Sequence, residues 1–269
     1  MSAKDIMGDE PQEVITLEDG TEVSGYRVLN RYISLTFNCD AGGFFSLKQG
    51  GFVGENVKVD GFNLNGELVL KQGMIGPEAK VYGHAELYGW ARIKDRAEVF
   101  GNAKVYGWST INEAAKVYGD SSVHGWTWVT GSAKVFDFAE IYGEAHVNNF
   151  AEVSGHTKVY GQSRISGNAR IKGHTEVHGK AWVDGNSYIT GKAEICGEAR
   201  ITQNAKITNA EVYGFLTVCK NTHLYGGKWG GCRIIDLTPI HSQSDPSNLH
   251  DPFILGGLLY EDSKRPGES

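Results

Sequence analysis

Residues 79–96 read Ala-Lys-Val-Tyr-Gly-His, Ala-Glu-Leu-Tyr-Gly-Trp and Ala-Arg-Ile-Lys-Asp-Arg, and this six-residue pattern continues without insertion to Asn204. The run contains 21 units, and the third residue is Val, Ile or Leu in all 21. The first residue is Ala, Ser or Thr in every unit, and the fifth residue is Gly in 16 units. A period of six with a regular glycine does not fit the 3.6-residue turn of an α-helix. The repeat therefore decides the fold.

The pattern predicts one short strand and one corner in each unit. In an extended segment the first and third residues lie on the same face, so the small and the aliphatic side chains point inward together. The fifth residue then supplies the positive φ of a tight corner, which glycine adopts freely and Asp or Asn tolerate. Its non-glycine replacements are Asp95, Glu113, Asp137, Asn149 and Gln203. Three successive units make one triangular coil, and stacked coils form an all-β parallel β-helix with an aliphatic interior.

The repeat loses its register at both ends. A five-residue unit at 205–209 interrupts it, after which the pattern resumes at Ala210, and residues 57–61 and 68–70 look like irregular coils. A solenoid needs caps, because an open end exposes strand edges to other chains.

We therefore expect three regions along the chain. Residues 1–55 form an N-terminal tail and a small β cap, and residues 56–232 form the repeat. Residues 233–269 form a C-terminal cap strand and an extended tail. Within these regions the pattern predicts a strand at Val14–Leu17, a turn at Asp19-Gly20, strands from Tyr26 to Phe37, a cap strand at 233–240 and an apolar arm at 253–260.

Composition excludes several classes of protein. The formal net charge is −6 and the pI is about 5.9, which argues against a nucleic-acid partner. No apolar run reaches the roughly 18 residues of a membrane span, and residues 1–5 do not resemble a signal peptide. The four cysteines, Cys39, Cys196, Cys219 and Cys232, have no paired spacing. We expect a cytoplasmic protein with reduced thiols and no membrane partner.

The repeat resembles the hexapeptide-repeat, left-handed β-helix superfamily. The segment Ser46-Leu-Lys-Gln-Gly-Gly-Phe-Val-Gly54 is similar to the K-x-G-x-x-G-G-W-I/V segment that precedes the repeats in YdcK-like proteins of bacteria and their phages, with Phe52 in place of the usual Trp. The resemblance covers about residues 25–225. It implies a left-handed coil with caps, and it implies no particular activity. If the protein is phage-encoded, its location is the host cytoplasm or the virion.

The outward positions form columns, in which each residue is followed by its equivalent three units later. Three of these columns are aromatic, and they are our candidate binding or interface residues. The first face carries Tyr82, Phe100, Tyr118 and Phe136, the second face begins with Tyr88 and Tyr106, and a corner carries Trp90, Trp108 and Trp126.

Two interpretations of these columns stay open. Rings stacked about 4.8 Å apart stabilise the coils themselves. Alternatively, contiguous apolar stripes mark an interface with another protein or with further copies of the chain. The third face is polar, and this asymmetry favours the interface. The resemblance implies frequent trimers, so a homo-oligomer, either a trimer or a dimer, is expected.

Histidines are the only candidates for catalysis. Acyltransferases of the superfamily use a histidine base beside a projecting loop, and the core run has no insertion; His84 and His156 would be the candidate bases. His124 and His178 are three coils apart, about 14 Å at the usual strand spacing, which is too far to share a metal. His156 and His174 lie on adjacent coils but lack further ligands in their column, so we expect a solvated pair, no metal and no cofactor.

The sequence thus favours a non-catalytic scaffold that binds a protein partner or itself through its aromatic faces. An acyltransferase-like enzyme with a site between subunits is one alternative. The other is a carbohydrate- or nucleotide-binding module that uses the tryptophan column.

Overall fold

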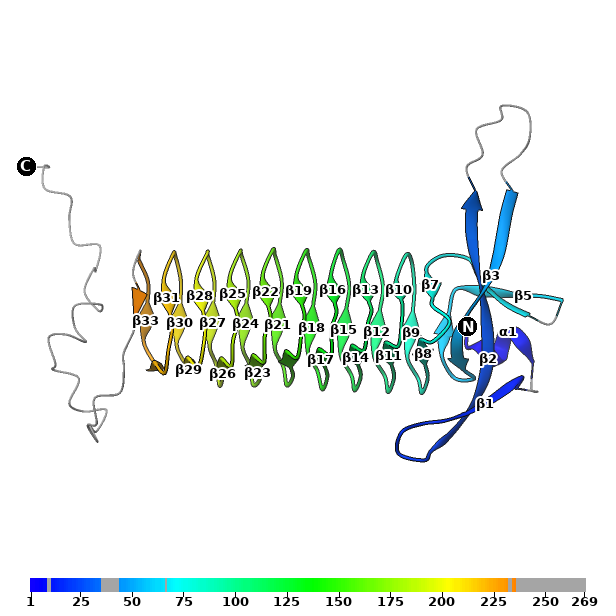
Figure 1. Ribbon diagram of the computed structural model, residues 1–269, viewed down its shortest axis with the longest axis horizontal. Coiled ribbons are helices and arrows are strands. Elements are labelled where there is room, and N and C mark those ends of the chain that lie inside the picture. Colours follow the sequence, from blue (N-terminus) through cyan, green and yellow to red (C-terminus); the bar gives the residue numbers. More distant parts are fainter. Residues whose placement is uncertain (9–10, 35–43, 66, 232–233, 236–269) are drawn as a thin grey trace, which may run out of the picture.

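The structure is a computed structural model that describes residues 1–8, 11–34, 44–65, 67–231 and 234–235. Figure 1 shows a straight rod of stacked coils with an N-terminal cap at one end. The described part of the chain is nearly all β, with a single short helix, α1 (Ala3–Met7). The expected all-β solenoid is confirmed.

Three parallel sheets form the three faces of the rod. Face 1 contains β8 (Lys80–Val81), β11 (Glu98–Val99), β14 (Lys116–Val117), β17 (Lys134–Val135), β20 (Glu152–Val153), β23 (Arg170–Ile171), β26 (Tyr188–Thr190), β29 (Lys206–Thr208) and β32 (His223–Tyr225). Face 2 contains β4 (Lys58–Val59), β9 (Glu86–Leu87), β12 (Lys104–Val105), β15 (Ser122–Val123), β18 (Glu140–Ile141), β21 (Lys158–Val159), β24 (Glu176–Val177), β27 (Glu194–Ile195), β30 (Glu211–Val212) and β33 (Lys228–Trp229). Face 3 contains β7 (Met74–Ile75), β10 (Arg92–Ile93), β13 (Thr110–Ile111), β16 (Trp128–Val129), β19 (His146–Val147), β22 (Arg164–Ile165), β25 (Trp182–Val183), β28 (Arg200–Ile201), β31 (Thr217–Val218) and β34 (Ile234–Ile235).

Each strand pairs with the strand three units later, which occupies the equivalent position in the next coil. Arg92 thus pairs with Thr110, and Glu98 pairs with Lys116. All 21 aliphatic residues at the third position are buried, as predicted, from Val81 to Ile201. The small first-position residues are buried beside them, so the interior is a continuous aliphatic stack. This stack is the hydrophobic core of the protein.

The corners use positive φ angles, as the pattern predicts. The five non-glycine corner residues have φ between 52° and 61°. Close stacking of coils adds a second constraint, because a Cβ placed on Gly83 would lie 3.0 Å from the backbone nitrogen of Gly101 in the next coil. Where a side chain is present, it can bond to the next coil: the backbone N–H of Glu113 donates to Asp95 at 3.1 Å.

The five-residue unit shortens one coil. Partners that span it lie one residue closer along the chain than in the regular coils, so that Glu194 pairs with Glu211 and Arg200 with Thr217. A second five-residue unit at 222–226 has the same effect on Glu211, which pairs with Lys228. Asn209 occupies the corner of the shortened unit, with φ at 52°. All three faces continue past this point, so the deletion does not disturb the stack.

The N-terminal cap is built on long antiparallel strands. β1 (Glu13–Thr16) and β2 (Glu22–Ser34) form a hairpin, and β2 pairs with β3 (Phe44–Gly54). The strand predicted at Val14–Leu17 lies one residue earlier, as β1, and the turn after it is confirmed, whereas Phe37 lies outside the described residues. β3 then pairs in parallel with β8, which joins the cap to face 1.

The glycines of the 46–54 segment allow this junction. A Cβ on Gly50 would lie 2.5 Å from the carbonyl oxygen of Ile75, and one on Gly51 would lie 2.3 Å from that of Ala79. The buried Asn30 side chain completes the junction: its Nδ2 donates to the Ile75 carbonyl at 2.7 Å, and its Oδ1 accepts from the Ile75 N–H at 2.9 Å.

One expectation about the cap needs correction. Residues 68–70 belong to β6 (Glu67–Leu70), which pairs with β2 and with β5 (Gly61–Leu64) instead of forming an irregular coil. The physical reason is that β5 and β6 make a hairpin that extends the cap sheet. At the other end, β34 lies within the expected cap strand, and residues 236–240 and the apolar arm at 253–260 lie outside the described residues. No helix in the described ranges has the length and apolar character needed to span a membrane.

Candidate functional site

The aromatic column of face 1 forms a continuous stack within the chain. Adjacent rings from Tyr82 to Phe136 have centroids 4.8–5.0 Å apart and planes within 2° of parallel. All four rings are half-buried, and Phe100 and Tyr118 are covered by a neighbouring ring on both faces. This geometry is the one expected of coil stabilisation.

The N-terminal hairpin lies beside the start of this stack. Glu18, in the turn between β1 and β2, forms an ion pair of 3.3 Å with Lys116 on face 1. Burial raises the pKa of the Tyr82 hydroxyl, and the nearby carboxylates of Glu98, Asp19 and Glu18 raise it further. The cap therefore shields part of the stripe that the sequence analysis offered as an interface.

Face 2 carries a mixed column of tyrosine and histidine. Tyr106, His124, Tyr142, Tyr160 and His178 stack with centroids 4.6–5.3 Å apart. The first two tyrosines, Tyr88 and Tyr106, are 38% and 37% exposed, so this predicted column is more accessible than that of face 1.

The corner between faces 2 and 3 carries the most exposed aromatic column. Trp90, Trp108 and Trp126 stack with centroids 5.2 and 5.1 Å apart. Trp126 ends the stack and is 62% exposed, against 40% and 41% for the other two. Glu144 follows it in the column, so one face of the Trp126 ring has no aromatic neighbour in the next coil. We call these three residues the tryptophan edge.

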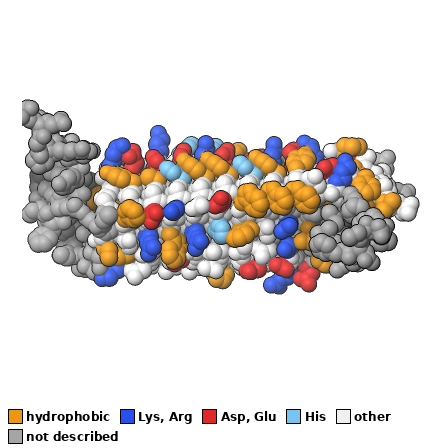
Figure 2. Space-filling model, turned by 90° about the horizontal axis from the view of Figure 1, so that it is seen from above, with side chains coloured by type: hydrophobic (Ala, Val, Ile, Leu, Met, Phe, Trp, Pro, Cys, Tyr) orange, Lys and Arg blue, Asp and Glu red, His pale blue; other side chains and the backbone are white. Residues whose placement is uncertain are grey.

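Face 3 continues this surface with tryptophan and arginine. Its strands present Arg92, Thr110, Trp128, His146, Arg164, Trp182, Arg200 and Thr217 outward at their first positions. A groove of about 490 Å³ runs along this face and the corner beyond the tryptophan edge, lined by Glu144, His146, Gln162, Arg164, Lys180, Trp182, Glu198 and Arg200. Figure 2, which views the rod from above, shows hydrophobic side chains gathered in rows along it, with basic side chains among them. The residues that follow each strand predicted only a polar face here, whereas the tryptophans and arginines stand at the positions that begin each strand.

The histidines proposed as catalytic bases do not meet. His84 and His156 are both exposed in one corner column, where Asn102, Asp120 and Phe138 separate them. His156 instead stacks on His174, with ring centroids 4.8 Å apart. Between β8 and β28 the strands follow one another every six residues, so no loop in that part of the chain projects over either ring.

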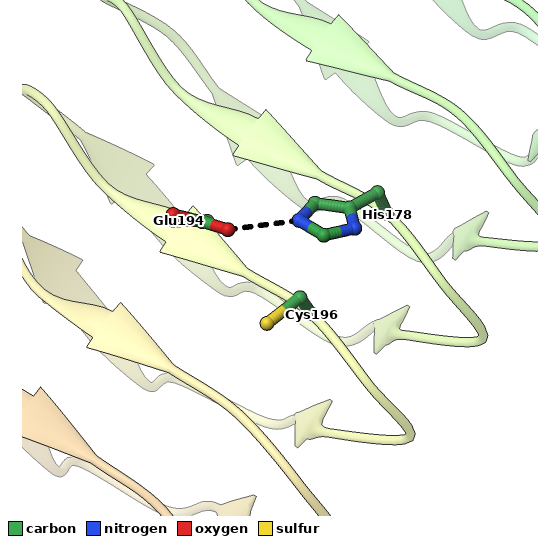
Figure 3. Close-up of side chains that lie close together, drawn as sticks. All are labelled: His178, Glu194 and Cys196. Atoms are coloured by element: carbon green, nitrogen blue, oxygen red, sulfur yellow. Dashed lines mark hydrogen bonds and ion pairs between the residues drawn. The ribbon is translucent and has the colours of Figure 1, made fainter.

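The structure brings together three other reactive side chains, His178, Glu194 and Cys196 (Figure 3). His178 follows β24, Glu194 begins β27 and Cys196 follows β27, so all three point outward from face 2. Nε2 of His178 lies 2.9 Å from Oε1 of Glu194, and the donor atoms of the three residues all lie within 4.8 Å of one another. Burial, followed by the charges of Glu194 and Glu211, raises the pKa of the Cys196 thiol.

This cluster was not predicted from the sequence. His178 and Cys196 occupy equivalent positions of adjacent coils, whereas the predicted histidine pairs included only His178 with the distant His124. The signal that finds the cluster is a His and a Cys in adjacent coils, with a carboxylate two residues before the Cys on the same strand.

Comparison with known proteins adds no further assignment. The chain matches no family model, and a search of curated proteins finds no significant similarity.

Proposed function

We propose that the protein is a non-catalytic binding scaffold that holds another protein against the tryptophan edge and the neighbouring strands of face 3. The observation that carries this proposal is the placement of the tryptophans. Of the six in the chain, Trp90, Trp108, Trp126, Trp128 and Trp182 lie on this edge and face and are 39–62% exposed. Only Trp229 is buried, at 8%.

Exposed tryptophan is characteristic of binding surfaces. Tryptophan and arginine dominate the binding energy of protein interfaces, because large flat side chains bury much area at little entropic cost. Face 3 interleaves both types, whereas the aromatic stack of face 1 is half-buried against itself. The proposed binding surface is therefore the tryptophan edge together with face 3.

Charge indicates the chemistry of the partner. The outward first-position column of face 3 contains three arginines and no acidic residue, although the chain carries a net charge of −6. A second copy that presents the same face would bring two such basic columns together. An acidic surface on a different protein is complementary to it.

The sequence resemblance adds three details to the proposal. It implies a left-handed coil, membership among YdcK-like proteins and a bacterial or phage origin. A homo-oligomer, either a dimer or a trimer, remains compatible with the scaffold through its other faces. The compartment proposed is the cytoplasm, or the virion if the protein is phage-encoded.

One observation favours a second candidate function. The open face of the Trp126 ring adjoins the groove, so a sugar or a base could stack there and extend along polar side chains. The acyltransferase-like alternative gains no comparable support, because His84 and His156 lie apart on an exposed corner.

Site-directed photo-crosslinking in the native host tests the proposal. A photoreactive residue is placed at position 126 on the edge, and a control is placed at Lys158, which is exposed on face 2. We expect one crosslinked protein from position 126 and not from position 158. Arg164→Glu should abolish the crosslink, because it reverses a charge on face 3 without touching the core.

Three outcomes would contradict the proposal. They are crosslinks of equal yield from both positions, a product that consists only of this chain, and a crosslink that survives both Arg164→Glu and Trp108→Ser. Quenching of tryptophan fluorescence by oligosaccharides or nucleotides, lost in Trp126→Ser, would instead support the second candidate.

A further inference from the structure

The cluster of His178, Glu194 and Cys196 lies on face 2, away from the proposed binding surface, and combines three different ligand atoms. An imidazole nitrogen, a carboxylate oxygen and a thiol sulfur converge there from two adjacent coils. The His178 ring is fixed by stacking on Tyr160, with centroids 4.8 Å apart and planes 4° from parallel. Its Nε2 faces Glu194, so the ring already points into the cluster.

Elsewhere on face 2, acidic and basic residues pair between neighbouring coils, but this pairing is absent at the cluster. The first residues of successive strands pair acid with base from Lys58 to Glu86 and from Glu86 to Lys104, and again between Glu140 and Lys158. Such alternation removes the repulsion between coils.

At the cluster, three glutamates follow in direct register: Glu176 pairs with Glu194, and Glu194 with Glu211. The outer two have partners of their own, since the Tyr160 hydroxyl donates to Glu176 at 3.2 Å and Lys228 forms an ion pair with Glu211 at 2.7 Å. Glu194, in the middle, faces the imidazole and the thiol. Like charges in register are destabilising, and a cation bound at Glu194 would relieve this repulsion.

We propose that His178, Glu194 and Cys196 bind a divalent cation of the zinc type. Nitrogen, sulfur and oxygen donors together suit Zn²⁺, whereas Ca²⁺ and Mg²⁺ require oxygen ligands throughout. Zinc bonds of about 2.0–2.3 Å place neighbouring ligand atoms about 3.3–3.7 Å apart in a tetrahedron. The separations in the cluster, from 2.9 Å to at most 4.8 Å, bracket that range, so small side-chain rotations complete the site.

The site has three protein ligands on an open sheet surface. All three side chains are half-buried, so solvent reaches the fourth position of the tetrahedron and a water molecule occupies it. The inference is independent of the proposed function, because the tryptophan edge and the cluster share no residue.

Titration of the full-length, tag-free, reduced chain with Co²⁺ tests the site. Thiolate bound to Co²⁺ gives an intense sulfur-to-metal absorption in the near ultraviolet, and tetrahedral Co²⁺ gives strong visible bands. We expect both to saturate at one ion per chain and to disappear when Zn²⁺ is added. Zn²⁺ should also raise the melting temperature, since an ion that binds only the folded state stabilises it.

Matched variants decide which residues bind. Cys196→Ser should lose the sulfur band, and His178→Gln and Glu194→Gln should weaken binding, while Cys219→Ser and His156→Gln should bind like the parent. Because the three ligands are half-exposed, circular dichroism of each variant without metal should match the parent. Absence of saturable binding in the parent would overturn the proposal. So would a sulfur band that survives Cys196→Ser or is lost in Cys219→Ser.

Discussion

The backbone N–H of Lys192 donates a hydrogen bond of 2.9 Å to the side-chain Oδ1 of Asn209. One coil earlier, the equivalent N–H of His174 donates to the backbone carbonyl of Gly191, at 2.8 Å. In the shortened coil a side-chain oxygen therefore takes the place of a main-chain acceptor. The five-residue unit therefore retains the hydrogen bond at this position although it is one residue shorter than a regular unit.

Removal of that oxygen should destabilise the solenoid. We expect Asn209→Gly, which keeps the corner conformation but loses the acceptor, to lower the free energy of unfolding by about 1 kcal/mol. Asn209→Asp retains an acceptor oxygen and should remain within a few tenths of the parent. Urea unfolding followed by circular dichroism measures both. Equal stability of the glycine and aspartate variants would show that the bond contributes nothing.

A charge in the aliphatic stack should prevent stable folding. Val135 is fully buried, so Val135→Asp places a carboxylate where it has neither water nor a partner, and we expect a loss of more than about 4 kcal/mol. The neighbouring Lys134→Ala changes an exposed side chain on the same strand and should lose less than about 1 kcal/mol. Thermal melting compares the two, and a Val135→Asp protein that melts with the parent would refute the register described here.

The aromatic stack of face 1 should act on stability and not on assembly. Phe100→Ser with Tyr118→Lys introduces residues that the same column holds at Ser154 and Lys172. Three ring contacts are lost, so we expect a destabilisation of roughly 2–4 kcal/mol with an unchanged molecular mass. Thermal unfolding and light scattering report the two quantities. A lower mass with an unchanged melting temperature would instead make this stack an interface.

Two tyrosines should ionise late. Burial and the charge of Glu176 raise the pKa of Tyr160 from 10.0 to about 12, and the pKa of Tyr82 is raised as well. A raised folded-state pKa favours the protonated phenol, so this stability is intact below pH 10 and is lost as the pH rises towards 12.

Absorbance at alkaline pH tests this expectation. Tyr160→Phe should remove a late phenolate transition and flatten the loss of stability above pH 10. A Tyr160→Phe titration curve identical to that of the parent at its alkaline end would contradict the assignment.

The regular part of the fold was predictable because its contacts are periodic. Burial of Val135 or a corner at Asp95 follows from the position of each residue within its unit, and each strand pairs with the strand three units away. The cap is different. The ion pair between Glu18 and Lys116 joins residues 98 apart in the chain, and no local pattern encodes it.

The candidate sites were predictable only in part. The column of Trp90, Trp108 and Trp126 was found because identical residues recur with the coil. The cluster around Glu194 combines unlike residues from two columns, so a search along single columns missed it. Its discovery requires the outward positions of adjacent coils to be compared together.

Strict pairing between equivalent units of successive coils also fixes the distance along the rod between any two residues by the number of coils that separate them. Insertion or removal of one whole coil between Trp126 and Cys196 would change their separation by about 4.8 Å and leave both on their present faces. A change of a single unit between Trp126 and His178 would instead turn everything downstream by about 120°, which would move His178 and Cys196 from one side of the rod to the next. Length and direction can therefore vary separately in this architecture, the first in steps of a whole coil and the second in steps of one unit.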